Sequence, residues 1–98
     1  MKIKKLEYKF IGSGEVGGFK FTQLNSNDKA YMYKVETEDN NIHYEIFLKK
    51  LSPICIDFEK RIYSETEFKE IYPSAKVFGI WAWNINDYKE AIKKFESL

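Results

Sequence analysis

Apolar and polar residues alternate with a period of two through most of the first half of the chain. The alternation recurs in four segments separated by polar or glycine-rich stretches: residues 6–10, 19–22, 31–35 and 42–48. Successive side chains of a β-strand point to opposite faces of a sheet, so each segment is predicted to be a strand. The stretches at 25–28 and 38–41 are short turns rich in Asn and Asp. The sequence therefore predicts an antiparallel meander of four strands.

The segment that follows Pro53 fits two interpretations. Ile54, Ile56, Phe58 and Ile62 share parity, which favours a fifth strand. Three of these residues also recur with a spacing of four, which fits one face of a helix. Periodicity alone leaves both interpretations open, and we expect the strand.

A short helix is predicted near residues 65–71. Ser64 and Glu67 stand three residues apart, as the hydroxyl and carboxylate of a capping box do at a helix N-terminus. Pro73 is expected to end this helix, because the residue before a proline avoids the α conformation.

The last quarter of the chain contains two further predicted elements. Residues 77–85 are apolar on both parities, as in a strand covered on both faces, so they are the best candidate for a central strand. A helix is expected near residues 86–97, capped by Asn86. Its apolar stripe has helical spacing and needs a sheet face to cover: Tyr88, Ala91, Ile92 and Phe95.

These elements predict one α+β domain that spans residues 1–98. Its mostly antiparallel sheet has five or six strands, with the short helix near 65–71 and the C-terminal helix near 86–97 packed on one sheet face. A chain of 98 residues fits one such domain. Aromatic residues make up 17% of the chain, and rings of that size bury enough area for a small core to suffice.

Charge and composition exclude several classes of protein. Sixteen Lys and Arg residues balance fifteen Asp and Glu residues, so the whole chain has no net pull toward nucleic acid and no acidic mimicry of it. No apolar run approaches the roughly 20 residues that span a bilayer, and no apolar signal segment follows the first lysines. We expect a cytoplasmic protein that does not bind membranes, such as a bacterial or phage accessory protein.

A glycine pattern is the most suggestive motif. Gly12, Gly14 and Gly17 satisfy G-x-G-x-x-G after a predicted strand, as in loops that let backbone amides approach a pyrophosphate. Residues 19–22 alternate as a strand, so the helix that would complete a dinucleotide site is missing. The three glycines are therefore weak candidates for cofactor binding, and we expect no cofactor.

Residues 11–20 also resemble the glycine-rich loop of protein kinases, which is a strand–loop–strand hairpin. Lys34 lies at a plausible distance for that family's nucleotide-binding lysine. The likeness covers about a quarter of the chain, and Phe19 stands where the family has Val. The H-R-D and D-F-G motifs do not occur.

His43 and Cys55 are the only histidine and cysteine, so no metal site and no disulfide are expected. His43 lies beside Glu45 on the polar side of a predicted strand, where an exposed histidine is a simpler interpretation than a general base. Cys55 stands between two isoleucines and is expected to be a buried, inert core residue. No catalytic residues are assigned.

Aromatic residues and lysines share the predicted sheet and form its candidate binding surface: Lys20, Tyr31, Tyr33, Lys34, His43, Phe47, Lys49, Trp81 and Trp83. Aromatic sheets flanked by lysines bind single-stranded nucleic acid in some proteins. Glutamates interrupt this surface. The apolar surroundings of the two tryptophans favour a buried position between sheet and helix over an exposed one.

The leading functional hypothesis is a small non-enzymatic binding or regulatory module. An exposed sheet face or edge would bind a protein partner or a second copy of the chain as a homodimer. The alternative hypothesis is a single-stranded nucleic-acid binder that uses the aromatics and lysines. A third is a nucleotide-using enzyme with the glycine-rich loop at residues 12–18.

Overall fold

The computed structural model describes residues 2–98, with the side chain of Glu15 left out. Over these residues the protein is α+β, with eight strands, one α-helix and two short 3₁₀ turns. Its contacts divide the chain into two compact units, which we describe separately. The three-stranded unit comprises Met1–Leu6 and Lys49–Tyr72, and the five-stranded unit comprises Glu7–Leu48 and Pro73–Leu98. The strands thus form two sheets where the sequence predicted one, and a single domain stays a prediction.

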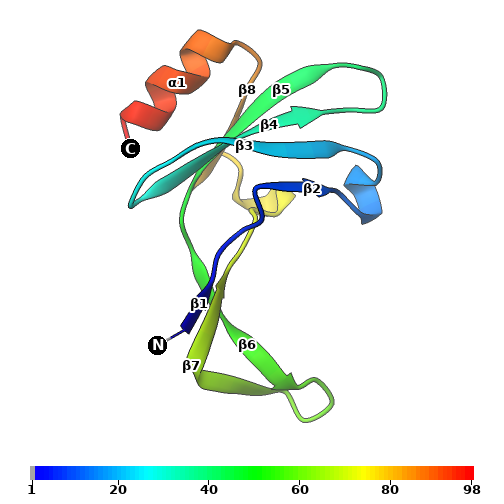
Figure 1. Cartoon of the computed structure of the whole chain (residues 1–98), viewed down its shortest axis with the longest axis vertical. Coiled ribbons are helices and arrows are strands. Elements are labelled where there is room, and N and C mark those ends of the chain that lie inside the picture. The colour runs from blue at the N-terminus through cyan, green and yellow to red at the C-terminus, as the bar shows by residue number, and fades with distance from the viewer. Residues whose placement is uncertain (1) are drawn as a thin grey trace. The chain divides into compact units, whose positions relative to one another are not determined.

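The five-stranded sheet contains the predicted meander. Its strands lie in the order β2-β3-β4-β5-β8, and all neighbours are antiparallel (Figure 1). Their bounds are β2 (Lys9–Ile11), β3 (Lys20–Ser26), β4 (Ala30–Glu36), β5 (Ile42–Leu48) and β8 (Ala82–Ile85). The turn chemistry acts as expected between β3 and β4, where the Asn27 Oδ1 accepts the N–H groups of Lys29 and Ala30, each at 2.8 Å. The four-strand meander is therefore confirmed.

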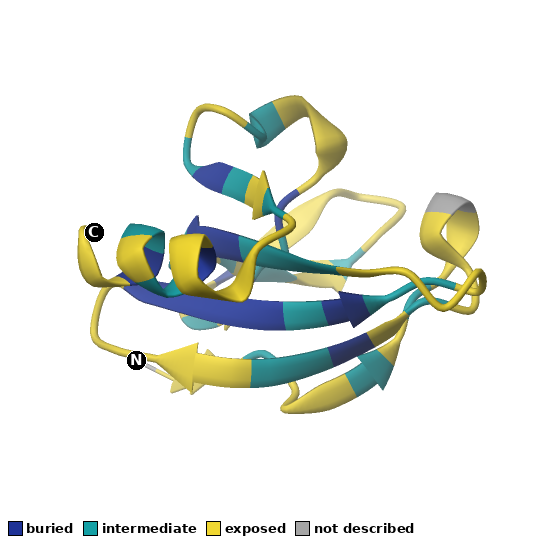
Figure 2. Ribbon diagram, turned by 90° about the horizontal axis from the view of Figure 1, so that it is seen from above, coloured by how far each residue is buried: buried dark blue, intermediate teal, exposed yellow. Residues whose placement is uncertain are grey.

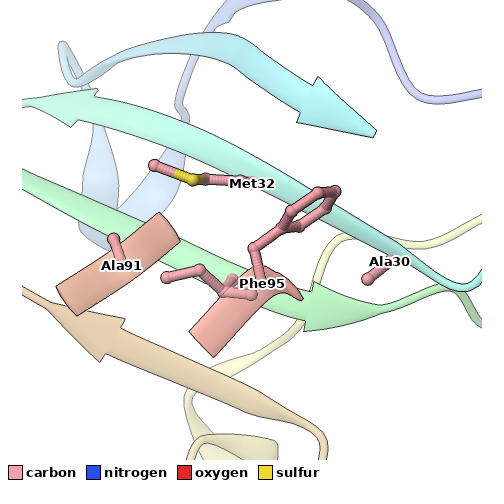
Figure 3. Close-up of a cluster of buried hydrophobic side chains, with 5 residues drawn as sticks. Ala30, Met32, Ala91 and Phe95 are labelled. Atoms are coloured by element: carbon pink, nitrogen blue, oxygen red, sulfur yellow. The ribbon is translucent and has the colours of Figure 1, made fainter. Parts of the chain in front are cut away.

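The C-terminal helix α1 (Tyr88–Glu96) packs on one face of this sheet. Ala91 and Phe95 from the helix meet Ala30, Met32 and Ile46 from β4 and β5 in a cluster of buried side chains (Figure 3). The predicted amphipathic helix is confirmed, because its apolar stripe covers the sheet.

The helix begins one residue later than predicted. Asp87 is the cap, and its Oδ2 accepts the N–H of Glu90 at 2.9 Å. The prediction of Asn86 as the cap is therefore wrong. A carboxylate at this position satisfies a free helix amide and also interacts favourably with the helix dipole.

The opposite face of the same sheet is lined by aromatic rings. Tyr33 and Phe47 are fully buried and stack with centroids 5.8 Å apart, and Phe10 stacks on Phe21 at 4.7 Å. The Tyr33 hydroxyl donates to the Glu7 carbonyl at 2.6 Å, so its one polar atom is satisfied. Buried residues are most frequent along the middle strands of the sheet (Figure 2).

Residues 77–85 do not form the predicted central strand. A 3₁₀ turn (Ala75–Val77) leads into a tight bend in which the Val77 carbonyl accepts the N–H groups of Ile80 and Trp81. Gly79 has φ of 92°, a conformation that favours glycine. Only Ala82–Ile85 remain as strand, and β8 lies at the edge of the sheet. Hydrophobic periodicity gives no sign of this bend, so the apolar run by itself predicts one continuous strand.

The three-stranded sheet consists of β1 (Lys2–Lys4), β6 (Leu51–Asp57) and β7 (Ile62–Glu70). β7 lies in the middle, parallel to β1 and antiparallel to β6. The strand predicted after Pro53 is therefore confirmed for Ile54 and Ile56, which lie in β6. Phe58 lies instead in the turn that follows, and Ile62 begins β7.

The helix predicted near 65–71 is wrong, because these residues belong to β7 and its end. The cap-like hydrogen bonds nevertheless form: the Ser64 Oγ accepts the N–H groups of Thr66 and Glu67 at 3.1 and 2.8 Å. They hold an irregular stretch of β7, beyond which Phe68 pairs with β1 on one side and β6 on the other. Pairing on both sides satisfies the backbone there, and it overrides the local helix signal.

Candidate functional site

The three-stranded unit has no apolar core among its described residues. Every large apolar side chain that the structure buries belongs to the five-stranded unit. In the three-stranded unit the buried side chains are polar, namely Ser64 and Glu70. A small sheet normally needs one covered apolar face for stability, so the apolar side chains of this sheet lack the usual cover.

Six large apolar side chains of this unit are exposed instead: Ile3, Leu51, Ile56, Phe58, Ile62 and Tyr63. Four of them lie at the end of the β6–β7 hairpin, and we call them the hairpin surface: Ile56, Phe58, Ile62 and Tyr63. The Phe58 side chain is 87% exposed and Ile56 is 67% exposed. Single exposed apolar residues are common in proteins. Here four lie within eight residues, with Ile56 and Tyr63 on opposite sides of the hairpin end because Tyr63 pairs with Cys55, so the hairpin end is a candidate for binding.

The turn of the hairpin holds Phe58 at its tip. The Asp57 Oδ1 accepts the N–H of Lys60 at 3.2 Å, and the Phe58 carbonyl accepts the N–H of Arg61 at 3.3 Å. Arg61 adopts φ of 52°, the left-handed conformation that reverses the chain into β7. The turn is thus closed by its own hydrogen bonds, which leave the Phe58 ring directed into solvent.

Charge at the tip is balanced. Asp57 and Glu59 contribute two negative charges, and Lys60 and Arg61 contribute two positive charges. The tip therefore offers no net attraction to phosphate groups of nucleic acids or lipids.

Buried polar groups anchor the base of the same unit. The Glu70 Oε1 accepts the N–H of Leu6 at 3.0 Å and so fixes the chain that follows β1 against the end of β7. The hairpin therefore projects from a base that is held by hydrogen bonds.

Both edges of the three-stranded sheet resist strand addition. β1 has three residues, two of which are lysines. Beside β6, the Lys50 carbonyl accepts the N–H of Ile71. Backbone groups of alternate residues point to the same side of a strand, so those of Lys50 and Ser52 point toward β7 and those of Pro53 point to the free edge. Pro53 lacks an N–H, which removes one donor from the free edge. Short, lysine-bearing and proline-bearing edges disfavour pairing with another chain, so the side chains and not the edges are the available binding feature.

The predicted aromatic surface is not on the outside of the protein. Tyr31, Tyr33 and Phe47 are 3%, 0% and 0% exposed and pack together behind β4 and β5. Lys20 and Lys34 lie on the other face of the sheet. Lys34 follows Tyr33 directly and so points the opposite way, and Lys20 shares the face of Glu36, its partner in the register and two residues from Lys34. The candidate residues therefore do not form one exposed surface, because these three rings are buried and the two lysines lie on the opposite face.

His43 and Glu45 form a pair, with the His43 Nε2 2.7 Å from the Glu45 Oε2 and both side chains mostly buried. The prediction that these two residues lie side by side is confirmed, whereas the expectation that His43 is exposed is wrong. Cys55 belongs to the three-stranded unit and is exposed, so the prediction of a buried cysteine is also wrong. Its neighbours Ile54 and Ile56 lie in the same three-stranded sheet, neither face of which packs against a core of buried apolar side chains.

The two tryptophans and Lys49 are half-buried. The Trp83 ring lies beneath the Lys94 ammonium of α1, with 4.0 Å from the nitrogen to the ring centroid. The Trp81 carbonyl accepts the N–H of Leu48 at 3.0 Å. Trp83 is thus partly covered by the C-terminal helix, as the buried interpretation requires.

The glycine-rich loop connects β2 and β3 as a hairpin and bonds to itself. Gly12 donates its N–H to the Phe19 carbonyl at 2.8 Å, Gly17 donates to Gly14 at 3.1 Å, and Phe19 donates to Val16 at 3.1 Å. A Cβ at Gly12 would lie 2.5 Å from the Val16 carbonyl oxygen, so glycine is needed there for packing. Among the weak cofactor candidates, the amides of Gly12 and Gly17 are engaged in this way and are not available to cradle a phosphate, while Gly14 contributes its carbonyl to the same loop.

The sequence does not predict the hairpin surface, because the spacing of Phe58 fits either a strand or a helix. One signal was present: a large ring directly followed by Glu59, Lys60 and Arg61, which are typical of a solvated turn. Exposure of Ile56 and Tyr63 has no such signal, because isoleucine and tyrosine in a strand normally indicate a core.

Among the side chains that the structure describes, which exclude Met1 and Glu15, no cluster of three or more His, Cys, Asp or Glu could hold a metal ion. Over the same residues, no helix is long and apolar enough to cross a membrane. Comparison of the chain with protein-family models, with curated proteins and with solved structures gives no match.

Proposed function

We propose that this protein is a non-enzymatic binding module that docks on a protein partner through the hairpin surface. The observation that carries the proposal is a sheet without an apolar core whose hairpin end exposes Ile56, Phe58, Ile62 and Tyr63. Burying one side chain of this size against a partner would contribute about 1.5–3 kcal/mol to the free energy of binding. Residues that are exposed in the unbound chain would therefore stabilise the complex.

The chemistry of the tip supports a protein partner over other classes. Its two acidic and two basic residues cancel, which disfavours a polyanion. Aromatic and branched side chains beside charged residues of both signs are typical of protein–protein interfaces. The blunted edges of β1 and β6 support recognition by side chains and not by strand addition.

The first test places a photo-crosslinking amino acid at position 58 of the full chain, expressed in its native host. The matched control places the same amino acid at position 80, since Ile80 is 71% exposed but belongs to the five-stranded unit. We expect a discrete protein adduct at position 58 and none of the same mass at position 80.

The second step adds Ile56→Ser to the chain that carries the crosslinker, with Ile11→Ser as the control. Both isoleucines are about equally exposed, at 67% and 69%, so neither change is expected to unfold the chain. Ile56→Ser should reduce the adduct about thirtyfold, the effect of losing about 2 kcal/mol at an interface centre. Equal adducts at positions 58 and 80, or equal loss in both serine variants, would contradict the proposal. An adduct with the mass of two chains would identify the partner as a second copy.

A further inference from the structure

A second surface, on the five-stranded unit, gathers lysines around a threonine. The strand register aligns Lys9, Thr22 and Lys34 across β2, β3 and β4, and the next row aligns Lys20 with Glu36. Residues directly opposite in a sheet, and residues two apart on a strand, point to the same face. These five side chains therefore share one face, and we call them the lysine cleft.

The lysine cleft lies on the part of the face that α1 leaves uncovered. The helix packs on β4, β5 and β8, whereas β2 and β3 extend away from it (Figure 1). A cleft of about 450 Å³ opens there, and its walls come from the three strands: Lys9, Phe10, Ile11, Lys20, Thr22 and Glu36. That volume lies in the range of small-molecule sites, which is roughly 300–1,000 Å³.

Charge in the lysine cleft is positive. Lys9 and Lys20 line the cleft together with Glu36, and the Glu36 carboxylate is already paired with Lys34 at 3.0 Å. The excess is therefore two positive charges. Among the described residues neither Lys9 nor Lys20 has an ion-pair partner. Thr22 lies between Lys9 and Lys34 on the neighbouring strands, about 4.8 Å away on each side, so its hydroxyl is within the ring of lysines.

We infer that the lysine cleft binds the phosphate group of a small organic phosphate. A doubly charged phosphate over Thr22 would accept a hydrogen bond from the hydroxyl and neutralise the two excess positive charges. Ile11, which is 69% exposed, offers an apolar wall for the rest of the ligand.

The position of the aromatic rings favours a small ligand over a nucleic-acid strand. Proteins that bind single strands stack the bases on rings beside their cationic groove. Here Phe21 and Tyr33 of the same strands point to the opposite face and are buried. Phe10 contributes to the cleft wall, but its ring stacks on Phe21 at 4.7 Å on that opposite face, so no ring offers a stacking platform beside the lysines.

The test titrates the full chain with pyrophosphate at low salt while amide NMR signals are followed. We expect saturable shifts at residues 9, 20, 22 and 34. Lys20→Ala should weaken binding about fivefold, and Glu36→Gln should strengthen it about threefold because it removes the competing charge. Lys29→Ala is the matched control, since Lys29 is exposed in the β3–β4 turn outside the cleft.

Three results would overturn the inference: no saturation by about 10 mM pyrophosphate, equal weakening by Lys29→Ala, or no gain from Glu36→Gln. Binding of a ten-nucleotide single strand at these lysines without binding of pyrophosphate would also contradict it. The lysine cleft and the hairpin surface lie in different units, so either can fail without the other.

Discussion

At the scale of single residues, Tyr33 links the aromatic face of the five-stranded sheet to the chain that enters it. Its hydroxyl donates to the Glu7 carbonyl at 2.6 Å and accepts a hydrogen bond from the Gln23 Nε2 at 3.0 Å. The ring itself is fully buried among other rings. A buried polar atom of this kind contributes mainly because its removal leaves its partners unsatisfied.

Tyr33→Phe is therefore expected to lower the free energy of unfolding by about 1–2 kcal/mol, since it strands the Glu7 carbonyl and the Gln23 amide. Urea unfolding monitored by tryptophan fluorescence measures this loss. Tyr8→Phe is the control, because Tyr8 is 64% exposed and its change should stay within about 0.5 kcal/mol. Equal stability of the two variants would show that the Tyr33 hydroxyl is not structurally important.

At the scale of elements, the C-terminal helix shows how closely a local pattern fixes a structure. Its apolar stripe and its end were predicted from spacing, and only the cap shifted from Asn86 to Asp87. Asn and Asp are both favoured as N-caps, so residue type alone does not decide which of the two caps the helix. The hydrogen bond from the Glu90 N–H to the Asp87 side chain identifies Asp87.

Asp87→Ala should cost about 1 kcal/mol of stability and allow the first turn of α1 to fray. Asn86→Ala should change stability by less than about 0.5 kcal/mol, because no cap hydrogen bond is lost. Thermal unfolding of the two variants side by side tests the assignment. A larger loss from Asn86→Ala would restore Asn86 as the cap.

Elements that depend on distant pairing were the ones that sequence could not predict. The meander followed from alternation and short turns, both of which are local. The capping-box signal at Ser64 was physically real, yet pairing of Phe68 with β1 and β6 overrode it. The hairpin surface escaped prediction for a related reason: whether Ile56 or Tyr63 is covered depends on what packs on the sheet, which no local pattern records.

At the scale of the whole molecule, burial is distributed unequally between the two units. The five-stranded unit holds every buried large apolar side chain among the described residues, on both faces of its sheet. The three-stranded unit relies on strand pairing and on the hydrogen bonds of Glu70 and Ser64. Regions with few buried apolar contacts open at lower free energy than the core, and binding surfaces are drawn from such regions.

Amide hydrogen exchange on the full, unbound chain tests this unequal burial most directly. The amides of β6 and β7 should exchange through local opening, at a free energy well below that of the β4 and β5 amides, whose exchange should need global unfolding. Equal protection of the two sheets would contradict the account, because it would mean that the hairpin is stabilised as strongly as the core and needs no partner to cover Phe58.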